Sequence, residues 1–261
     1  MKKFSVICPV YNEEEMIPYT APSIYNIKPN EVIFILDRCT DRSQEIIESI
    51  NKGYRKTILR LLHVREKSDY RFHTAFLRRK AYEMASNDII LNTAIDIKLD
   101  PRIAEYLGYL DQETKLIKFG FYDYPFNVQS FMRQIYSTFT SWKSNSGLYL
   151  FSKKAWMETE NQEEVKVLES SEDTLLIKSI ESKYKSRYFN TKSLHLRPTE
   201  TEERDRIRGV AYRNVLKASP MRAFLTSMVM LRPQLFVAYM QSASNISKGE
   251  ERECPARAAS L

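Results

Sequence analysis

The sequence has few cysteines and no long hydrophobic run. Its 261 residues include three cysteines, and no two of them are spaced as Cys-x-x-Cys. An odd number at these spacings predicts neither a disulfide framework nor a zinc site, so we expect a reducing compartment. No segment reaches the roughly 18 uninterrupted apolar residues of a membrane-spanning helix, and a mean hydropathy of -0.45 argues against a polytopic membrane protein. Because Met1 and two lysines lead directly into an expected strand, we also expect no signal peptide.

The charge balance is basic. The net charge is +7 with 43% hydrophobic and 28% charged residues, which is ordinary for a soluble globular protein. A basic chain favours anionic partners such as nucleotides, phospholipid surfaces or nucleic acid. The positive charges are interspersed with 33 acidic residues and are not focused into one motif, so a nucleic-acid-binding protein is the weaker hypothesis and we expect no nucleic-acid partner.

Short apolar runs alternate with helical patterns through the first hundred residues. We expect strands at 4–9, 31–37, 58–64, 88–95, 115–122, 147–152 and 186–197. Helical patterns cover 41–52, 73–86, 172–183 and 202–217, and another begins at Asp100-Pro101. The segment 13–27 contains Pro18 and Pro22, so its helix is expected to be short or irregular. The alternation predicts an α/β fold with a mainly parallel mixed sheet flanked by helices.

Two of the expected strands end in polar turns. The first leads through Pro9 into Tyr11-Asn12-Glu13, and the second ends at Asp37. Ligands of open α/β sheets bind outside the carboxyl ends of such strands. The pattern therefore favours a nucleotide-handling enzyme.

Six short motifs follow one another along residues 4–200. They are Pro9-Val-Tyr-Asn-Glu13, Leu36-Asp-Arg-Cys-Thr-Asp41, Arg78-Arg-Lys-Ala-Tyr-Glu-Met-Ala85, Ala94-Ile-Asp-Ile-Lys-Leu-Asp-Pro101, the strand led by Gly147, and Glu172-Asp173. In this order and in these contexts, the motifs resemble those of the family-2 glycosyltransferases. The resemblance implies a GT-A (Rossmann-like) fold and an inverting, metal-assisted transfer, of the hexosyltransferase class, from a UDP- or GDP-sugar to an acceptor hydroxyl or a lipid phosphate.

The resemblance assigns residues to the nucleotide-sugar donor. Tyr11 would stack on the base and Asp37 would accept a hydrogen bond from it, while Pro9 and Glu13 would act through the turn. Arg78 would reach the base or a phosphate. Two alternatives stay open: Glu13 as a carboxylate in a helix's first turn, and Arg78 as a surface cation.

The same donor motifs depart from the family pattern at two places. Arg38 and Cys39 replace the small residues that are usual in the second turn, which either changes the base pocket or fills it. The first Asp of the family's Asp-x-Asp is Ala94 here, so only the second, Asp96, remains. The resemblance therefore assigns no residue of this chain to the ribose and metal contacts of the first Asp.

A diphosphate leaving group needs cationic neutralisation, and Mn²⁺ or Mg²⁺ prefers oxygen ligands shared with phosphates. Asp96 is the expected ligand; its alternative role as a helix N-cap suits Asp100 better. Some GT-A enzymes place a late histidine on the metal, which makes His195 a second candidate beside the alternative of a structural histidine. His63 and His73 have no comparable context.

The acceptor hydroxyl needs a general base. In the family the Asp of the Glu-Asp pair has this role, which carries over to Asp173 in preference to Glu172. A base opposite the leaving group implies in-line displacement with inversion. The pair could also serve as the capping segment of a helix, and both roles can hold together.

Residues 220–240 are the most apolar stretch, and basic residues flank them. Such a segment can lie in a membrane interface, pack on the catalytic domain or form a homodimer contact. With a membrane contact, the acceptor would be a lipid-linked sugar or polyprenyl phosphate, and the protein would be cytoplasmic and peripheral on the membrane's cytoplasmic face. The expected domains are 1–200 (nucleotide-sugar half 1–100, acceptor half 101–200), C-terminal helices over 201–245, and a flexible tail, 246–261.

Two other enzymatic hypotheses remain. A nucleotidyltransferase with a related sheet would want a Gly-rich, Lys- or Arg-bearing loop after the first strand, where only Tyr11-Asn12-Glu13 is found. A catalytically degenerate family member that still binds nucleotide sugars is suggested by Ala94.

Overall fold

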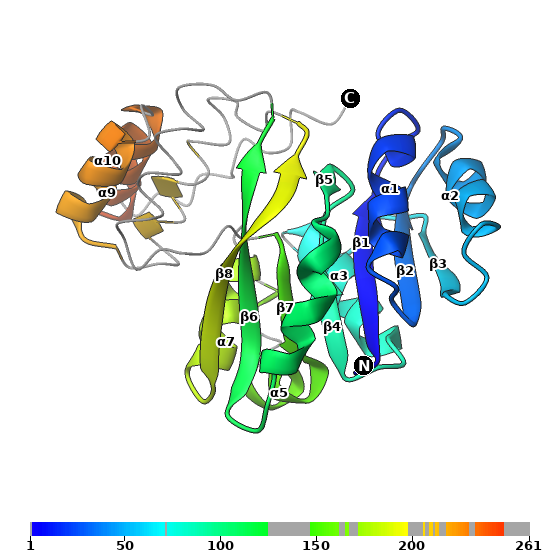
Figure 1. Cartoon of the computed structure of the whole chain (residues 1–261). Coiled ribbons are helices and arrows are strands. Elements are labelled where there is room, and N and C mark those ends of the chain that lie inside the picture. The colour runs from blue at the N-terminus through cyan, green and yellow to red at the C-terminus, as the bar shows by residue number, and fades with distance from the viewer. Residues whose placement is uncertain are drawn as a thin grey trace. The chain divides into compact units, whose positions relative to one another are not determined.

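The computed structural model describes most of the first 197 residues and parts of the rest (Figure 1). The described residues are 2–70, 72–124, 147–161, 165–166, 172–197, 206, 209–210, 212–213, 218–229 and 233–247. The chain divides into two compact units, Met1–Pro198 and Thr199–Leu261. Most of the helix predicted over 202–217, and residues 248–261 of the predicted tail, lie outside the described residues.

Within the described residues, the first unit is built on an eight-stranded mixed sheet in the order β3-β2-β1-β4-β7-β6-β8-β5. The strands are β1 (Phe4–Val10), β2 (Glu31–Asp37), β3 (Ile58–Val64), β4 (Ile89–Asn92), β5 (Ile97–Lys98), β6 (Thr114–Asp123), β7 (Tyr149–Ser152) and β8 (Lys185–His195). Strands β3, β2, β1 and β4 pair in parallel, as do β6 and β8. Strand β7 is antiparallel to β4 and β6, and β5 to β8. The predicted α/β fold with a mainly parallel mixed sheet is confirmed.

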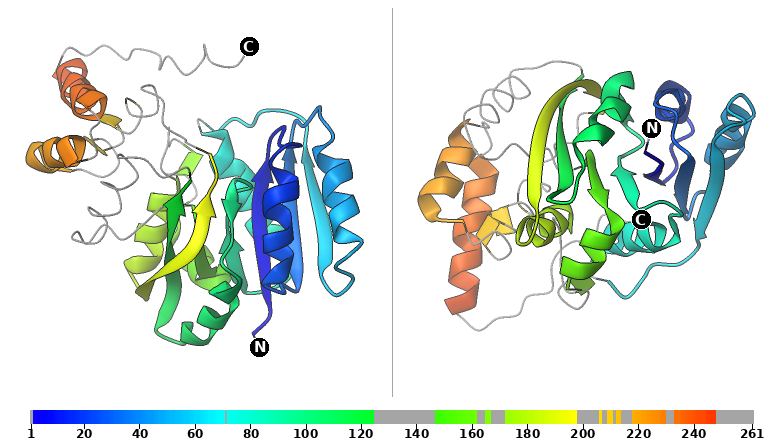
Figure 2. Two further views of the ribbon diagram at one scale, coloured as in Figure 1. Left: turned by 45° about the horizontal axis from the view of Figure 1, so that its top comes forward. Right: turned by 60° about the horizontal axis from the view of Figure 1, so that its bottom comes forward.

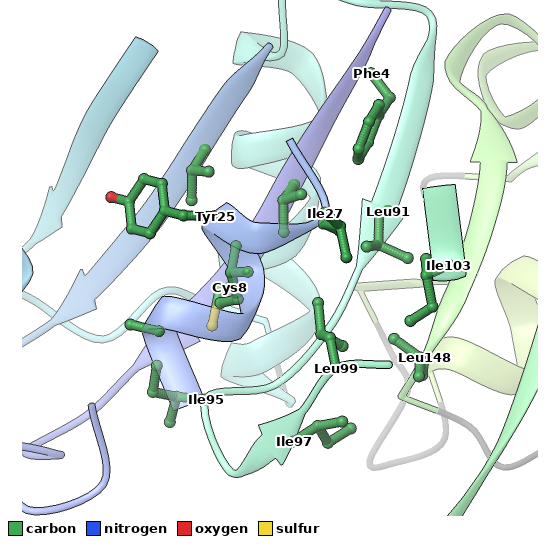
Figure 3. Packing of buried hydrophobic residues seen from close by; sticks show 14 of the residues in the cluster. Phe4, Cys8, Tyr25, Ile27, Leu91, Ile95, Ile97, Leu99, Ile103 and Leu148 are labelled. Carbon is green, nitrogen blue, oxygen red and sulfur yellow. The ribbon is translucent and has the colours of Figure 1, made fainter. Parts of the chain in front are cut away.

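Helices cover both faces of this sheet (Figure 2). One face packs against α1 (Ile17–Asn26), α2 (Ser43–Asn51) and the 3₁₀ helix η1 (Pro101–Tyr109), and the other against α3 (His73–Met84), α5 (Lys153–Thr159) and α7 (Glu172–Glu181). The two-residue period of a strand sorts the side chains between these layers. In β1, Val6 and Cys8 join the first core and Ile7 the second. Figure 3 shows Cys8 packed beside Tyr25 and Ile95 in the first core.

Three local features differ from the sequence expectation, and the first is α5, a helix that was not predicted. Helix α1 continues through Pro22, although proline removes one hydrogen bond of the helix. Its Ile17, Ala21 and Ile24 are fully buried, and that burial outweighs the local preference. Strand β5 was not predicted, because two residues show no periodicity; its pairing with β8 defines it.

The second unit contains two described helices, α9 (Pro220–Val229) and α10 (Pro233–Ser247). The Tyr239 hydroxyl donates a hydrogen bond to the carbonyl of Ala218 at 2.7 Å, and the rings of Phe224 and Phe236 lie 5.3 Å apart. A side chain at Gly209 would put its Cβ 2.2 Å from the Leu235 carbonyl oxygen, so only glycine allows this close approach. Among the described helices, none combines the length and apolarity needed to cross a membrane.

Candidate active site

Charged residues from distant parts of the sequence influence the pKa of Cys8, a buried residue near the carboxyl end of β1. The thiol of Cys8 is fully buried, and burial is the main reason why its pKa is raised. The charges of Asp96 and Glu13 raise that pKa further, while Arg78 lowers it. Because these electrostatic effects weaken with distance, the three predicted site residues lie near the strand that carries Cys8.

The carboxylate of Asp37, at the end of β2, is held by a guanidinium and an imidazole. Arg38 donates to both of its oxygens at 2.8 Å, and Nε2 of His73 lies 3.1 Å from Oδ1. The other ring nitrogen of His73 faces the backbone N–H and the hydroxyl of Ser68 at 3.0 Å. Burial raises the pKa of Asp37, but the hydrogen bonds of Arg38 and His73 outweigh it, and the net pKa is lowered. The carboxylate is therefore ionised and oriented.

Two residues of the turns that follow β1 and β2 have left-handed backbones, Asn12 at φ 50° and Arg38 at φ 49°. The conformation at Arg38 brings its guanidinium over the ring of Tyr11, 5.4 Å from the centroid. Tyr11 is 56% exposed, so its ring remains accessible. Arg38 thus connects the two residues predicted to hold a base, and it stands where the family pattern has a small residue.

Glu13 forms a two-point ion pair with Arg197, which follows β8. One guanidinium nitrogen donates to Oε1 at 2.9 Å and another to Oε2. The backbone N–H of Glu13 donates a hydrogen bond to the hydroxyl of Ser43 at 2.9 Å. The turn after β1 is therefore connected to the far side of the sheet, and the charge of Arg197 reaches Asp96.

Asp96 and His195 face each other. The distance from Oδ2 of Asp96 to Nε2 of His195 is 3.4 Å, and Nδ1 of the same imidazole lies 2.9 Å from Oδ1 of Asp123. Burial raises the pKa of Asp96, but the His195 contact and the charge of Arg197 outweigh it and lower the pKa overall. Asp100 forms the predicted cap of η1, accepting from the Arg102 N–H at 3.0 Å, which leaves Asp96 available for the site.

The acidic pair at the start of α7 is buried against Arg78. The guanidinium of Arg78 donates to Glu172 at 2.7 Å and to Asp173, and the hydroxyl of Tyr149 donates to Asp173 at 2.9 Å. Burial, then the charge of Asp173, raises the pKa of Glu172 to about 7 despite the opposing effect of Arg78. Arg78 is only 7% exposed, so its alternative as a surface cation is wrong.

We tested whether the residues around Asp96 suit a divalent cation. Adjacent ligands of an octahedral Mg²⁺ lie about 3 Å apart, since each is about 2.1 Å from the ion, and the 3.4 Å between Asp96 and His195 is close to that spacing. No group of three or more His, Cys, Asp or Glu side chains in the described part of the chain is arranged to hold a metal. A pair fits a cation that takes its other ligands from phosphates and water.

Sequence reasoning missed four residues of this cluster: His73, Asp123, Tyr149 and Arg197. His73 was given no functional context, yet it contacts Asp37. Asp123 ends β6 and Tyr149 begins β7, so a search for polar residues at strand ends could have found both. Arg197 gives no such signal, because its partner Glu13 is 184 residues away.

Comparisons with known proteins agree with this architecture. The model of the family described as glycosyl transferase family 2 matches residues 5–165, more than half of the chain. Two curated relatives are undecaprenyl-phosphate 4-deoxy-4-formamido-L-arabinose transferases from Pectobacterium carotovorum and Pectobacterium atrosepticum, each 31% identical over 115 residues. That match covers 41% of this chain and 34% of each relative, so it spans about a third of their length.

Solved structures share the fold at low identity. A mannosyltransferase from Pyrobaculum calidifontis in complex with GDP-Man and Mn²⁺ aligns with a TM-score of 0.62 at 15% identity, covering 98% of this chain and 77% of that one. Glucosyl-3-phosphoglycerate synthase from Mycobacterium tuberculosis, in complex with Mn²⁺, UDP and phosphoglyceric acid, aligns with a TM-score of 0.57 at 16% identity, covering 82% and 76%. At these identities the likeness establishes the GT-A fold alone. Together with the family match, it means that this chain belongs to glycosyl transferase family 2.

Proposed function

We propose that this glycosyltransferase moves a sugar from a UDP- or GDP-sugar to an acceptor hydroxyl or lipid phosphate, with a divalent cation and with inversion at the anomeric carbon. The observation that carries the proposal is the facing pair Asp96 and His195, whose spacing suits two ligands of one cation. A single site that includes both Asp96 and Asp173 is supported by the pKa of Cys8. The charges of Asp96 and of Arg78 both affect that pKa, and Arg78 contacts Asp173.

The donor nucleotide is assigned to the ends of β1 and β2. The accessible ring of Tyr11 offers a stacking surface, and the oriented carboxylate of Asp37 offers an acceptor to a base N–H. Pro9 fits the end of β1. The carbonyl of Ile7 faces β4, and Pro9, two residues later, faces the same side. Because Pro9 lies beyond the last β1–β4 pair, the sheet needs no N–H at this position. Glu13 holds the turn through Arg197.

Asp96 and His195 would hold Mn²⁺ or Mg²⁺ together with the donor diphosphate. When bound, the cation neutralises the negative charge that develops on the leaving diphosphate. With only two protein ligands, a single ion would keep its other coordination positions for phosphate oxygens and water.

Asp173 is proposed as the general base. Its Oδ1 is held by Arg78 and Tyr149, so Oδ2 is the oxygen that can take the acceptor's proton, from the O–H of an alcohol or the P–O–H of a monoprotonated lipid phosphate. The acceptor oxygen then bonds to the anomeric carbon while the bond to the diphosphate breaks on the opposite side, which inverts the configuration. The contacts of Arg78 favour a role in positioning the acidic pair over a direct contact with the donor.

A lipid phosphate is the acceptor class that the second unit favours. Residues 206–247 contain six basic residues and no Asp or Glu: Arg206, Arg208, Arg213, Lys217, Arg222 and Arg232. On α9 the buried positions are small, while Met221, Phe224, Leu225 and Met228 are exposed with the i, i+3, i+4, i+7 spacing of one helix face. A basic helix with an exposed apolar stripe suits an anionic membrane surface. The acceptor in the names of the Pectobacterium relatives, undecaprenyl phosphate, is of the same class.

A donor screen tests the proposal. UDP-, GDP- and dTDP-sugars are added with Mn²⁺, and the melting temperature of the full chain is measured. A donor at 100 times its Kd adds about 2.7 kcal/mol of stability, and we expect the shift to be confined to one base. Asp96→Asn should remove the Mn²⁺-dependent part of the shift. Asp173→Asn should retain the shift and lower transfer by about 10²–10⁴-fold.

The control variant is Glu113→Gln, which removes only an exposed ion pair with Lys185. If no donor of any base shifts the melting temperature with Mn²⁺ present, the donor assignment is wrong. If a donor binds but wild-type enzyme neither transfers nor hydrolyses it, the chain is a degenerate member of the family.

A further inference from the structure

We propose that Asp123 is a positioning residue, which fixes the ring of His195 so that Nε2 points at the cation held with Asp96. This inference rests on the proposed metal role of Asp96 and His195. It concerns a residue outside every motif that the sequence matched, and it starts from the strand pairing around His195.

The backbone of His195 is held from two sides. Its carbonyl accepts a hydrogen bond from the N–H of Tyr124 at 2.8 Å, and it is the register partner of Ile97 in β5. In β6, its register partner is Asp123, which follows a register shift between Gly120 and Tyr122. The shift changes which side chains of β6 and β8 lie opposite each other, and it leaves the carboxylate of Asp123 beside the imidazole. The remaining freedom of His195 is the rotation and protonation of its ring.

The two ring nitrogens meet two different carboxylates. Nδ1 lies 2.9 Å from Asp123, within the range of a strong N–H···O hydrogen bond, and Nε2 lies 3.4 Å from Asp96, beyond that range. An ionised carboxylate can only accept, so the shorter contact requires that Nδ1 carry the proton. A ring that keeps this proton on Nδ1 and has none on Nε2 presents a lone pair on Nε2, which is the form that can ligate a metal.

The ring has a third neighbour that limits its rotation. The ring of Phe121 lies 5.6 Å from the imidazole at an interplanar angle of 52°. Phe121 and Asp123 are two residues apart on β6 and therefore project from the same face of the strand. One strand thus supplies both a packing surface and a hydrogen-bond acceptor for His195, an arrangement that raises ligand basicity and fixes orientation in metal sites.

Histidine NMR measures this role directly, because the chain has three histidines. Ring ¹H–¹⁵N spectra of the full chain, assigned with His63→Asn and His73→Asn, report the tautomer of His195 without any metal. We expect the Nδ1–H form in the wild type and in Glu113→Gln. In Asp123→Ala we expect loss of that form, and Asp123→Asn, whose amide oxygen still accepts, should retain more of it.

Titration with Mn²⁺ alone gives the second readout, since the paramagnetic ion broadens the ring signals of a nearby histidine. Asp123→Ala should raise the Mn²⁺ concentration for half-maximal broadening of His195 by about 10–100-fold. His195→Ala, followed by free Mn²⁺ in EPR, measures the contribution of the ligand itself.

The outcomes separate the two proposals. If His195→Ala weakens Mn²⁺ binding but Asp123→Ala changes neither the tautomer nor the affinity, Asp123 has no positioning role and the metal role stands. If the wild type binds Mn²⁺ no better than His195→Ala, the metal role of His195 is wrong and the inference fails with it. If Asp123→Ala does not fold, the same two readouts are taken on Asp123→Asn.

Discussion

The guanidinium of Arg78 is buried between two carboxylates, and its surroundings set what its loss would cost. It contacts Glu172 and Asp173, and all three side chains are nearly inaccessible. Removing one partner of a buried ionic group leaves charge without compensation, which is far more damaging than losing a surface pair. Arg78 is therefore central to the stability of the first unit as well as to the acidic pair.

We predict that Arg78→Met lowers the free energy of unfolding by about 3–5 kcal/mol at pH 7.5. The reason is that two carboxylates remain buried without their cation. Urea unfolding followed by circular dichroism measures the change. Lys80→Met, at an exposed position of the same helix, is the matched control and should stay within about 0.5 kcal/mol of wild type. A loss below 1 kcal/mol for Arg78→Met would mean that solvent reaches the pair.

A pH dependence follows from Glu172. Burial raises its pKa from 4.5 to about 7, so the folded protein holds the proton more tightly than the unfolded chain does. The contribution of this group to stability is then complete below pH 4.5 and is lost as the pH rises through about 7. Glu172→Gln cannot ionise, so we predict that the wild type loses stability relative to this variant over that interval. Urea unfolding at half-unit pH steps measures the difference; two parallel curves would contradict the prediction.

At the level of single residues, sequence reasoning worked for side chains at strand ends and failed for their partners. Asp37 and Asp96 could be selected because each follows an apolar run. Their partners could not, because the contacts of His73 with Asp37 and of Arg197 with Glu13 connect positions 36 and 184 residues apart. Such pairs depend on the completed sheet, which local patterns do not describe.

Among the elements, the loop from Asp96 to η1 depends on Asp100. One carboxylate oxygen accepts from Arg102 and the other from the N–H of Lys192 at 2.8 Å, while the N–H of Asp100 donates to Ser193 at 2.9 Å. These bonds attach the loop that carries Asp96 to β8, the strand that carries His195. The separation of the two proposed ligands is thus set by an anchor four residues away from Asp96.

We predict that Asp100→Ala costs about 2 kcal/mol at pH 7, because hydrogen bonds to Arg102 and Lys192 outweigh burial and lower the Asp100 pKa from 3.8 to about 2. The contribution of a lowered pKa is present above 3.8 and is lost as the pH falls toward 2. Urea unfolding at pH 7 and pH 3 measures the gap between variant and wild type, which should narrow at the lower pH. Glu105→Gln, on the exposed side of η1, is the control and should show no gap. An equal gap at both pH values would exclude an ionic contribution.

The elements themselves were predictable where burial and local pattern agree. Each of the seven expected strands is present, because β1, β2 and their neighbours are short apolar runs bounded by polar turns. Agreement ended at α1, at β5 and at α5, a helix that the sequence analysis did not predict. Helix α1 contains Pro22 yet is held by its buried face, and β5 exists through two pairs with β8. Both depend on packing partners that lie elsewhere in the chain.

At the scale of the whole molecule, the two units differ in the exposure of their large apolar side chains. Among its described positions, α9 buries only small residues such as Ala223 and exposes Met221 and Met228, whereas α10 buries the large Leu235 and Tyr239. An ordinary helical hairpin would bury the larger groups, since burial of each is worth about 1.5–3 kcal/mol. We therefore expect a partner to cover the apolar face of α9, and the six basic residues within 206–247 of the sequence make an anionic membrane the hypothesis to test.

We predict that the full chain sediments with vesicles containing phosphatidylglycerol, and that binding weakens as salt is raised because anionic lipid contributes about 1 kcal/mol per nearby Lys or Arg. Combined replacement of Met221, Leu225 and Met228 by serine removes three of the four residues in the apolar stripe of α9. These three are 67%, 50% and 60% exposed and are the most accessible of the four. The expected loss of vesicle binding is at least about tenfold, since each apolar side chain that inserts is worth more than 1 kcal/mol.

The matched control for that experiment is Met157→Ser, an equally accessible methionine of α5 in the first unit, which should bind vesicles as the wild type does. Sedimentation velocity without lipid tests the rival use of the same face. A dimer that the triple variant converts to monomer, with no vesicle binding by the wild type, would assign the stripe to a contact between two copies. Vesicle binding that the triple variant retains in full would place the membrane contact elsewhere in the chain, because the lipid would then be held without three of the four large apolar side chains that α9 exposes within the described residues.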